Sequence, residues 1–126
     1  RFNRTKAIKS KSKFNELSQK ITVNTQQGTH YIDVSEINYL EASSMYSIIH
    51  TDSSQLIVSK PLRDFEFLTQ HLFFRTHRSF LVNTKKIVRF SSVEGTEVSL
   101  INGTHIPLSQ ANKIRFKEYM SATYGY

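Results

Sequence analysis

Short runs of alternating apolar and polar residues, separated by turn signals, occupy most of this chain from Lys20 onward and restrict its fold more than any other feature. Alternation with a period of two is typical of strands that bury one face. Connections this short fit antiparallel hairpins, because parallel pairing needs longer crossovers. The pattern predicts strands at 20–26, 29–33, 37–42, 46–51, 55–59, 79–83, 86–91, 96–101 and 104–108.

Two segments have instead the three- to four-residue apolar spacing of an amphipathic helix. The first covers about residues 61–71, where Pro61 suits the first helical position. The second covers about 110–122, with Ser109 as the expected N-cap. The expected fold class is therefore mainly β, with about nine or ten short antiparallel strands and two small helices. The apolar residues of the two helices are Leu62, Phe65, Leu68 and Leu72, and then Ile114, Phe116, Tyr119 and Met120.

Length and composition are those of a soluble protein with a single domain. The 126 residues suit one hydrophobic core, and 38% apolar residues with nine Phe and six Tyr exclude a disordered chain. No apolar run approaches the ~18 residues that span a bilayer, and no signal-type hydrophobic stretch follows the basic N-terminus. We therefore expect a cytoplasmic location. The absence of Cys excludes disulfides, thiolate metal sites and a cysteine nucleophile.

The net charge of +7 is distributed unevenly. Residues 1–20 hold seven basic side chains and one acidic, residues 21–74 have a net charge of −4, and residues 75–126 have +5. An anionic partner is therefore expected to meet the C-terminal half of the folded part.

The chain starts with a basic segment that differs in composition from the rest. Residues 1–19 have too few apolar positions for a packed helix and are predicted to be an interdomain linker, and residues 20–126 to be the domain. Because the first residue is Arg1 rather than Met, we expect the chain to have been cut from a longer protein. The linker cations suit phosphate contacts and simple solvation equally well.

Patterns that mark catalysis or metal binding are few. The five His residues lie far apart and form no H-x-x-x-H or H-x-H pair. No Ser stands in a G-x-S-x-G elbow, and four scattered Gly residues build no phosphate loop. Asp33, Glu36 and Glu41 form the nearest carboxylate cluster, and solvation at strand ends explains them. We therefore expect no catalytic residue, no cofactor and no metal.

Residues 73–91 form the most informative stretch, with five basic side chains and no acidic one. Hydroxyl and amide side chains are interleaved with Phe and Val, a mixture that suits phosphate contacts and contacts to base edges. A positively charged hairpin that only keeps the protein soluble fits the composition equally well. The basic residues are Arg75, Arg78, Lys85, Lys86 and Arg89.

Several motifs follow one another in a fixed order: I-x-Y-L-E-A at 37–42, Lys60-Pro61-Leu62 at a helix start, FRTHRSFLVN at 74–83, Lys86-Ile87, and I-P-L-S at 106–109. Together they resemble the LytTR-type DNA-binding domain of bacterial two-component response regulators, over about residues 20–120. The resemblance implies an elongated arrangement of antiparallel sheets with small flanking helices. It also implies that loops, and not a recognition helix, enter successive major grooves, and that a receiver domain lies upstream.

The resemblance assigns DNA contact to three places. In the loop at 43–46, Met45 and Tyr46 suit a thymine methyl but fit core positions equally well. In the basic stretch, Arg78 is the best candidate for reading a base, whereas His77 is assigned an orienting, structural role. In the turn at 109–112, Gln110 stands where the family often has a basic residue and suits adenine better than guanine. The expected DNA-binding residues are Ser43, Ser44, Met45, Tyr46, Arg75, Arg78, Ser79, Lys85, Lys86, Ser109, Gln110 and Asn112.

These observations predict a sequence-specific, double-stranded-DNA-binding output domain of a response regulator that controls transcription. The expected partners are promoter direct repeats, on which two copies sit, and the upstream receiver domain; the isolated domain is expected to be monomeric. The alternative is a protein-interaction module whose basic face docks an acidic partner. An RNA-binding module ranks third, because the aromatic residues lie in alternating core positions and form no evident stacking platform.

Overall fold

The computed structural model describes residues 19–93 and 95–125. The predicted linker, apart from Gln19, lies outside these residues. Within the described residues, ten antiparallel strands form three sheets, with the strand orders β1-β2, β5-β4-β3-β7-β6 and β10-β9-β8. The strands are β1 (Lys20–Thr25), β2 (Gly28–Asp33), β3 (Ile37–Ser43), β4 (Tyr46–Thr51), β5 (Gln55–Val58), β6 (Phe73–His77), β7 (Phe80–Asn83), β8 (Ile87–Ser91), β9 (Glu97–Leu100) and β10 (His105–Pro107).

Two helices flank the sheets, as expected, but their details differ from the prediction. The first, η2 (Leu62–His71), has 3-10 geometry, and Pro61 is its N-cap and not its first residue. The second, α2 (Lys113–Tyr124), begins three residues late because a 3-10 turn, η4 (Gln110–Asn112), follows Ser109. Further 3-10 turns are η1 (Val34–Glu36) and η3 (Thr84–Lys86).

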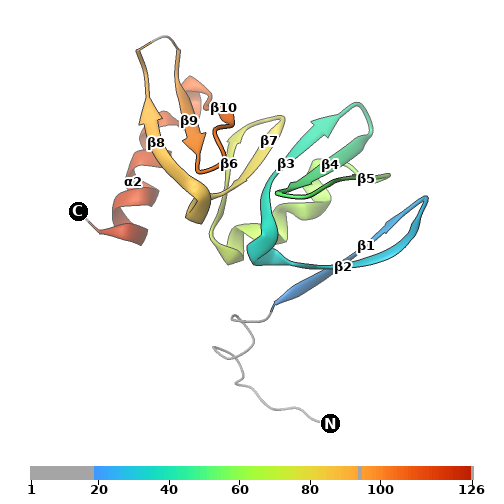
Figure 1. Cartoon of the computed structure of the whole chain (residues 1–126). Helices are drawn as coiled ribbons and strands as arrows, with labels where there is room; N and C mark the ends of the chain where they lie inside the picture. The colour runs from blue at the N-terminus through green and yellow to red at the C-terminus, as the bar shows by residue number, and fades with distance from the viewer. Residues whose placement is uncertain (1–18, 94, 126) are drawn as a thin grey trace.

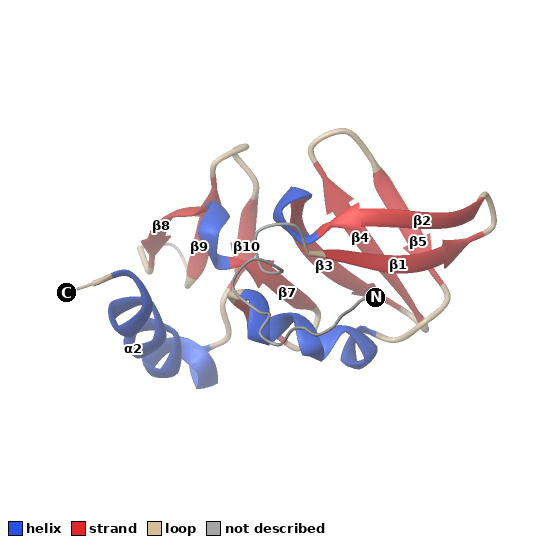
Figure 2. Cartoon of the chain, turned by 90° about the horizontal axis from the view of Figure 1, so that it is seen from below, coloured by secondary structure: helices blue, strands red, loops and turns tan. Residues whose placement is uncertain are grey.

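The part of the five-stranded sheet formed by β6 and β7 is buried on both faces, and this explains the one strand that the sequence pattern missed. One face packs against the β1–β2 hairpin and η2, and the other packs against the three-stranded sheet and α2. Figure 2 shows these layers, with β8, β9 and α2 at one end and β1 and β2 at the other. In β6 the neighbours Phe73 and Phe74 enter opposite cores, so the segment has no apolar–polar alternation. Leu81 and Val82 of β7 divide in the same way.

Asn83 is the buried polar side chain that fixes where β7 ends. Its Nδ2 donates to the Ile37 carbonyl oxygen (2.9 Å) at the start of β3, and its Oδ1 accepts from the Lys85 N–H (3.1 Å). The side chain thus joins two strand ends that lie 46 residues apart in sequence. A buried amide that uses both its ends in this way costs little to bury, but its loss leaves two backbone groups without partners.

We expect Asn83→Ala to lower the free energy of unfolding by about 2 kcal/mol, because the Ile37 carbonyl and the Lys85 N–H lose their partners. Urea denaturation followed by circular dichroism measures the change. Asn24→Ala is the matched control: Asn24 is exposed and accepts only from the Thr29 hydroxyl (2.9 Å), so its loss is expected to cost about 0.5 kcal/mol or less. Equal losses in the two variants would contradict the role of Asn83.

Tyr39 lies on the five-stranded sheet with its ring stacked on His50, at a centroid separation of 4.2 Å and an interplanar angle of 13°. His50 Nε2 lies 2.9 Å from Glu41 Oε1. Burial, and secondarily the charge of Glu41, raises the pKa of the Tyr39 hydroxyl above its ordinary value. The neutral phenol is therefore favoured by the folded state.

Because the pKa of Tyr39 is higher in the folded state than in the unfolded state, its contribution is complete below about pH 10 and is lost as the pH rises through the folded-state pKa. Tyr39→Phe has no such ionisation. We therefore expect the free energy of unfolding to fall less between about pH 8 and about pH 11 in Tyr39→Phe than in the native chain. Urea titrations at both pH values measure this difference, and identical alkaline losses would contradict it.

Candidate nucleic-acid interface

Two of the three predicted contact places follow directly from the order of the strands in the five-stranded sheet. The β3–β4 connection and the β6–β7 connection leave the sheet at the same edge, because β3 pairs antiparallel with both β4 and β7. Figure 1 shows both loops along the upper side of the molecule. The segment from Leu108 to η4 joins the same edge through contacts described below. We refer to residues 43–46, 77–79 and 108–110 together as the loop edge.

Backbone hydrogen bonds join the three parts of the loop edge. The Ala42 N–H donates to the Ser79 carbonyl oxygen (2.8 Å), which ties the β3–β4 loop to the tip of the β6–β7 hairpin. The Ser109 N–H donates to the Thr76 carbonyl oxygen (2.8 Å), which ties the entry to η4 to the same hairpin. The three loops are therefore held in a fixed relation by the strands that carry them.

The β3–β4 loop presents its side chains to solvent. Ser44 has a left-handed backbone (φ 59°), which makes the chain reverse within two residues. Met45 is 79% exposed and Tyr46 is 47% exposed. Both side chains therefore lie outside the core, which excludes the core positions that the sequence had left open for them.

The tip of the β6–β7 hairpin is shaped by Arg75. Its Nε donates to the His77 carbonyl oxygen (3.1 Å), Nη2 donates to the Arg78 carbonyl oxygen, and Nη1 pairs with Glu66 of η2. His77 Nδ1 accepts from the Ser79 N–H (3.1 Å), which agrees with its predicted orienting role. Arg75 is thus bound to the protein itself, whereas the Arg78 side chain is exposed and has no ion pair among the described residues.

At the third place, Asn112 and Gln110 have different surroundings. Asn112 is half-buried: its Nδ2 donates to the Arg75 carbonyl oxygen (3.2 Å) and its Oδ1 accepts from Arg115 (3.0 Å). Gln110 is exposed and its Nε2 donates to the Thr96 hydroxyl (2.8 Å). Asn112 therefore docks η4 onto β6, and Gln110 is the more accessible of the two.

Lys85 and Lys86 are close to Arg78 in sequence but lie at the other end of the hairpin. They belong to η3, after the four residues of β7, which span about 13 Å. The Thr84 N–H donates to the carbonyl oxygen of Leu72 (2.9 Å), directly before β6 begins. The structure therefore does not bring Lys85 and Lys86 together with the loop edge.

No sequence pattern indicated the role of Glu66, which anchors Arg75, because the partners lie nine residues apart on different elements. Among the described residues, no group of three or more His, Asp or Glu side chains is placed to hold a metal ion. In the same part of the chain, no helix has the length and apolar character needed to cross a membrane.

Comparisons with known proteins identify the family of this fold. The family model for the LytTr DNA-binding domain matches residues 27–121. A solved structure described as the LytTr DNA-binding domain of a putative methyl-accepting/DNA response regulator from Bacillus cereus has 27% sequence identity and a TM-score of 0.69. The match covers 80% of this chain and 95% of that one. No curated protein gives a significant match.

The family match extends from the β1–β2 turn to α2 and so includes the whole loop edge. Fold, motif order and family model lead to the same conclusion: the chain belongs to the LytTr DNA-binding domain family.

Proposed function

We propose that this chain binds double-stranded DNA sequence-specifically, as the output domain of a two-component response regulator that controls transcription. The observation that carries the proposal is the loop edge: three loops with exposed Met45, Arg78 and Gln110 stand side by side, each fixed by the strands beneath it. Rigid loops carrying exposed basic and polar side chains suit entry into a groove. The domain acts by binding and carries out no catalysis.

Different residues of the loop edge have different roles in this proposal. Arg78 reads a base, because its fork of donors is free to grip the edge of a guanine. Ser43, Ser44 and Ser79 bind phosphates through their hydroxyl groups. Met45 and Tyr46 contact a thymine methyl, and Ser109 and Gln110 contribute at the third loop. Arg75 and Asn112 position these loops through the contacts described above.

The remaining parts of the proposal concern location and assembly, and the resemblance to the family supports them. The domain works in the cytoplasm, joined through the basic linker to a receiver domain. Two copies occupy direct repeats in a promoter, and the isolated domain is monomeric. Joining two copies raises their effective concentration on the DNA without new contacts, which suits a small domain whose residues 21–126 have a net charge of only +1.

We expect Arg78→Ala to reduce discrimination between the preferred duplex and random duplex by about 1 to 3 kcal/mol, because a bidentate contact to a base is lost. Selection of bound sequences from random duplexes identifies the preferred duplex, and titrations of both duplexes at one salt concentration measure the ratio. Arg63→Ala, another exposed arginine but on η2, is the control and should leave the ratio unchanged.

Equal weakening of both duplexes by Arg78→Ala would mean that Arg78 binds phosphate. A native chain that binds all duplexes alike would contradict sequence-specific binding and favour the alternative of a docking module for an acidic protein.

Variants of Lys85 and Lys86 test which of two interfaces is correct: the one predicted from the basic stretch of the sequence, or the one inferred from the structure. The basic stretch predicts that each contacts a phosphate, so each loss would flatten the salt dependence of binding by about one phosphate. The structure places both away from the loop edge. We therefore expect the slope of log affinity against log salt to be the same in Lys85→Ala, Lys86→Ala and the native chain. A slope reduced by about one would extend the interface to η3.

A further inference from the structure

A lysine that the sequence motifs left without a role stands beside the loop edge. Ser47, the second residue of β4, is fully buried, and its hydroxyl donates to the Lys60 carbonyl oxygen (2.8 Å). The Lys60 N–H donates to the Val58 carbonyl oxygen (2.8 Å), and Val58 is paired with Ser47 in the sheet. The turn that carries Lys60 is therefore fixed next to the start of β4.

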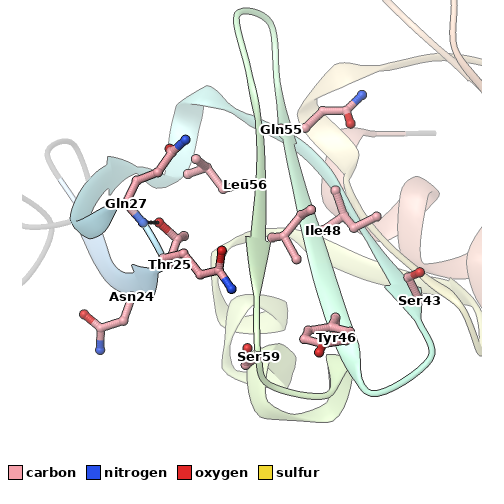
Figure 3. A pocket seen from close by; sticks show the side chains of 11 residues that line it. Asn24, Thr25, Gln27, Ser43, Tyr46, Ile48, Gln55, Leu56 and Ser59 are labelled. Atoms are coloured by element: carbon pink, nitrogen blue, oxygen red, sulfur yellow. Dashed lines mark hydrogen bonds between the residues drawn. The ribbon is translucent and has the colours of Figure 1, made fainter.

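This position belongs to the same end of the sheet as the β3–β4 loop. Tyr46 is the first residue of β4, and Ser59 follows the last residue of β5, so both lie at one end of the β4–β5 hairpin. Figure 3 shows Tyr46 and Ser59 together at this end and Gln55 at the opposite end. Lys60 therefore continues the loop edge beyond Tyr46, on the side away from Arg78.

The charge of Lys60 is available to a ligand. The residue is exposed, and none of the ion pairs formed among the described residues includes it. The acidic residue nearest to it in sequence is Asp64 on η2, whose N–H donates to the Pro61 carbonyl oxygen (3.0 Å). Arg63 stands between them in sequence and is also exposed.

The spacing of the strands determines what Lys60 meets. Neighbouring strands lie about 4.8 Å apart, so the end of β5 stands about 10 Å to the side of β3. The major groove of DNA is about 12 Å wide and is bordered by phosphates. When the β3–β4 loop enters a groove, a cation displaced by this amount lies over the bordering strand.

We propose that the Lys60 ammonium binds a backbone phosphate of the DNA strand bordering the groove that the β3–β4 loop enters. The site rests on the proposed function and extends it along the edge of the five-stranded sheet to β5. A lysine ammonium binds phosphate as a compact point charge, and the fixed turn beneath it lowers the cost of ordering its backbone.

Salt dependence tests the phosphate contact. The affinity of the full chain for its selected duplex is measured between about 50 and about 200 mM salt. The native chain loses affinity as salt rises over this range. Because Lys60→Gln lacks one phosphate contact, its loss of affinity is expected to be about 3.5-fold smaller than that of the native chain. Lys60→Arg keeps the charge and should keep the native slope. The control is Lys20→Gln, which removes the same charge from an exposed lysine that pairs with Asp33 at the start of β1.

A second measurement locates Lys60 on the DNA. The chain has no Cys, so Lys60→Cys provides a unique attachment point for an iron–EDTA group that cleaves nearby DNA. Cleavage at one or two positions of a strand bordering the selected site is expected, whereas the same group at Lys20→Cys should give no such localised cleavage. Melting temperatures equal to that of the native chain show that the variants are folded.

The outcomes separate the two proposals. If Arg78→Ala changes sequence preference but Lys60→Gln keeps the native slope and the Lys60→Cys conjugate gives no localised cleavage, the phosphate site is wrong and the proposed function stands. If the native chain shows no sequence preference and Lys60→Gln still flattens the slope, Lys60 binds phosphate on a surface that is not sequence-specific. If Lys60→Gln keeps the native slope, the Lys60→Cys conjugate gives no localised cleavage and Arg78→Ala keeps the native sequence preference, then the phosphate site is wrong and Arg78 does not read a base.

Discussion

Burial of β6 and β7 on both faces of the five-stranded sheet is the constraint on which the rest of this structure depends. Phe73 and Leu81 enter one core, while Phe74 and Val82, the next residues in each strand, enter the other. A strand fixed from two sides cannot slide in register without exposing one apolar set. The tip of the β6–β7 hairpin therefore has a single position, and the exposed Arg78 is presented by a rigid support.

Polar contacts then shape the edge that the two cores position. The Arg75 guanidinium donates to the carbonyl oxygens of His77 and Arg78 and pairs with Glu66. Its charge, which the sequence offered for DNA contact, therefore binds groups within the protein. The Ser47 hydroxyl likewise donates to a carbonyl oxygen, that of Lys60, and so fixes the turn that carries Lys60. The half-buried Arg75 and the buried Ser47 thus hold the backbone that presents the exposed Arg78 and Lys60. The division between positioning and contacting residues is the physical basis of the proposed interface.

Much of the fold and part of the site were predictable from local pattern. Nine of the strands, the hairpin at Asn102-Gly103 and the two flanking helices follow from alternation, turn chemistry and helical spacing, and the motif order gave the family that the family model confirms. The strand at Phe73–His77 did not follow, because a strand buried on both faces has no alternation. The role of Asn112 also escaped prediction, since its partner Arg75 lies 37 residues away.

The sequence by itself determined the fold class, the family and the set of chemically capable side chains, because these depend on local periodicity and on the identity of residues. Only the tertiary structure decided which of those side chains stand together. It separated Lys85 and Lys86 from Arg78, exposed Met45 and Tyr46, and placed Lys60 beside Ser47 at the start of β4. The reason is that antiparallel pairing joins the ends of strands distant in sequence, while residues a few positions apart along one strand lie at opposite ends of it.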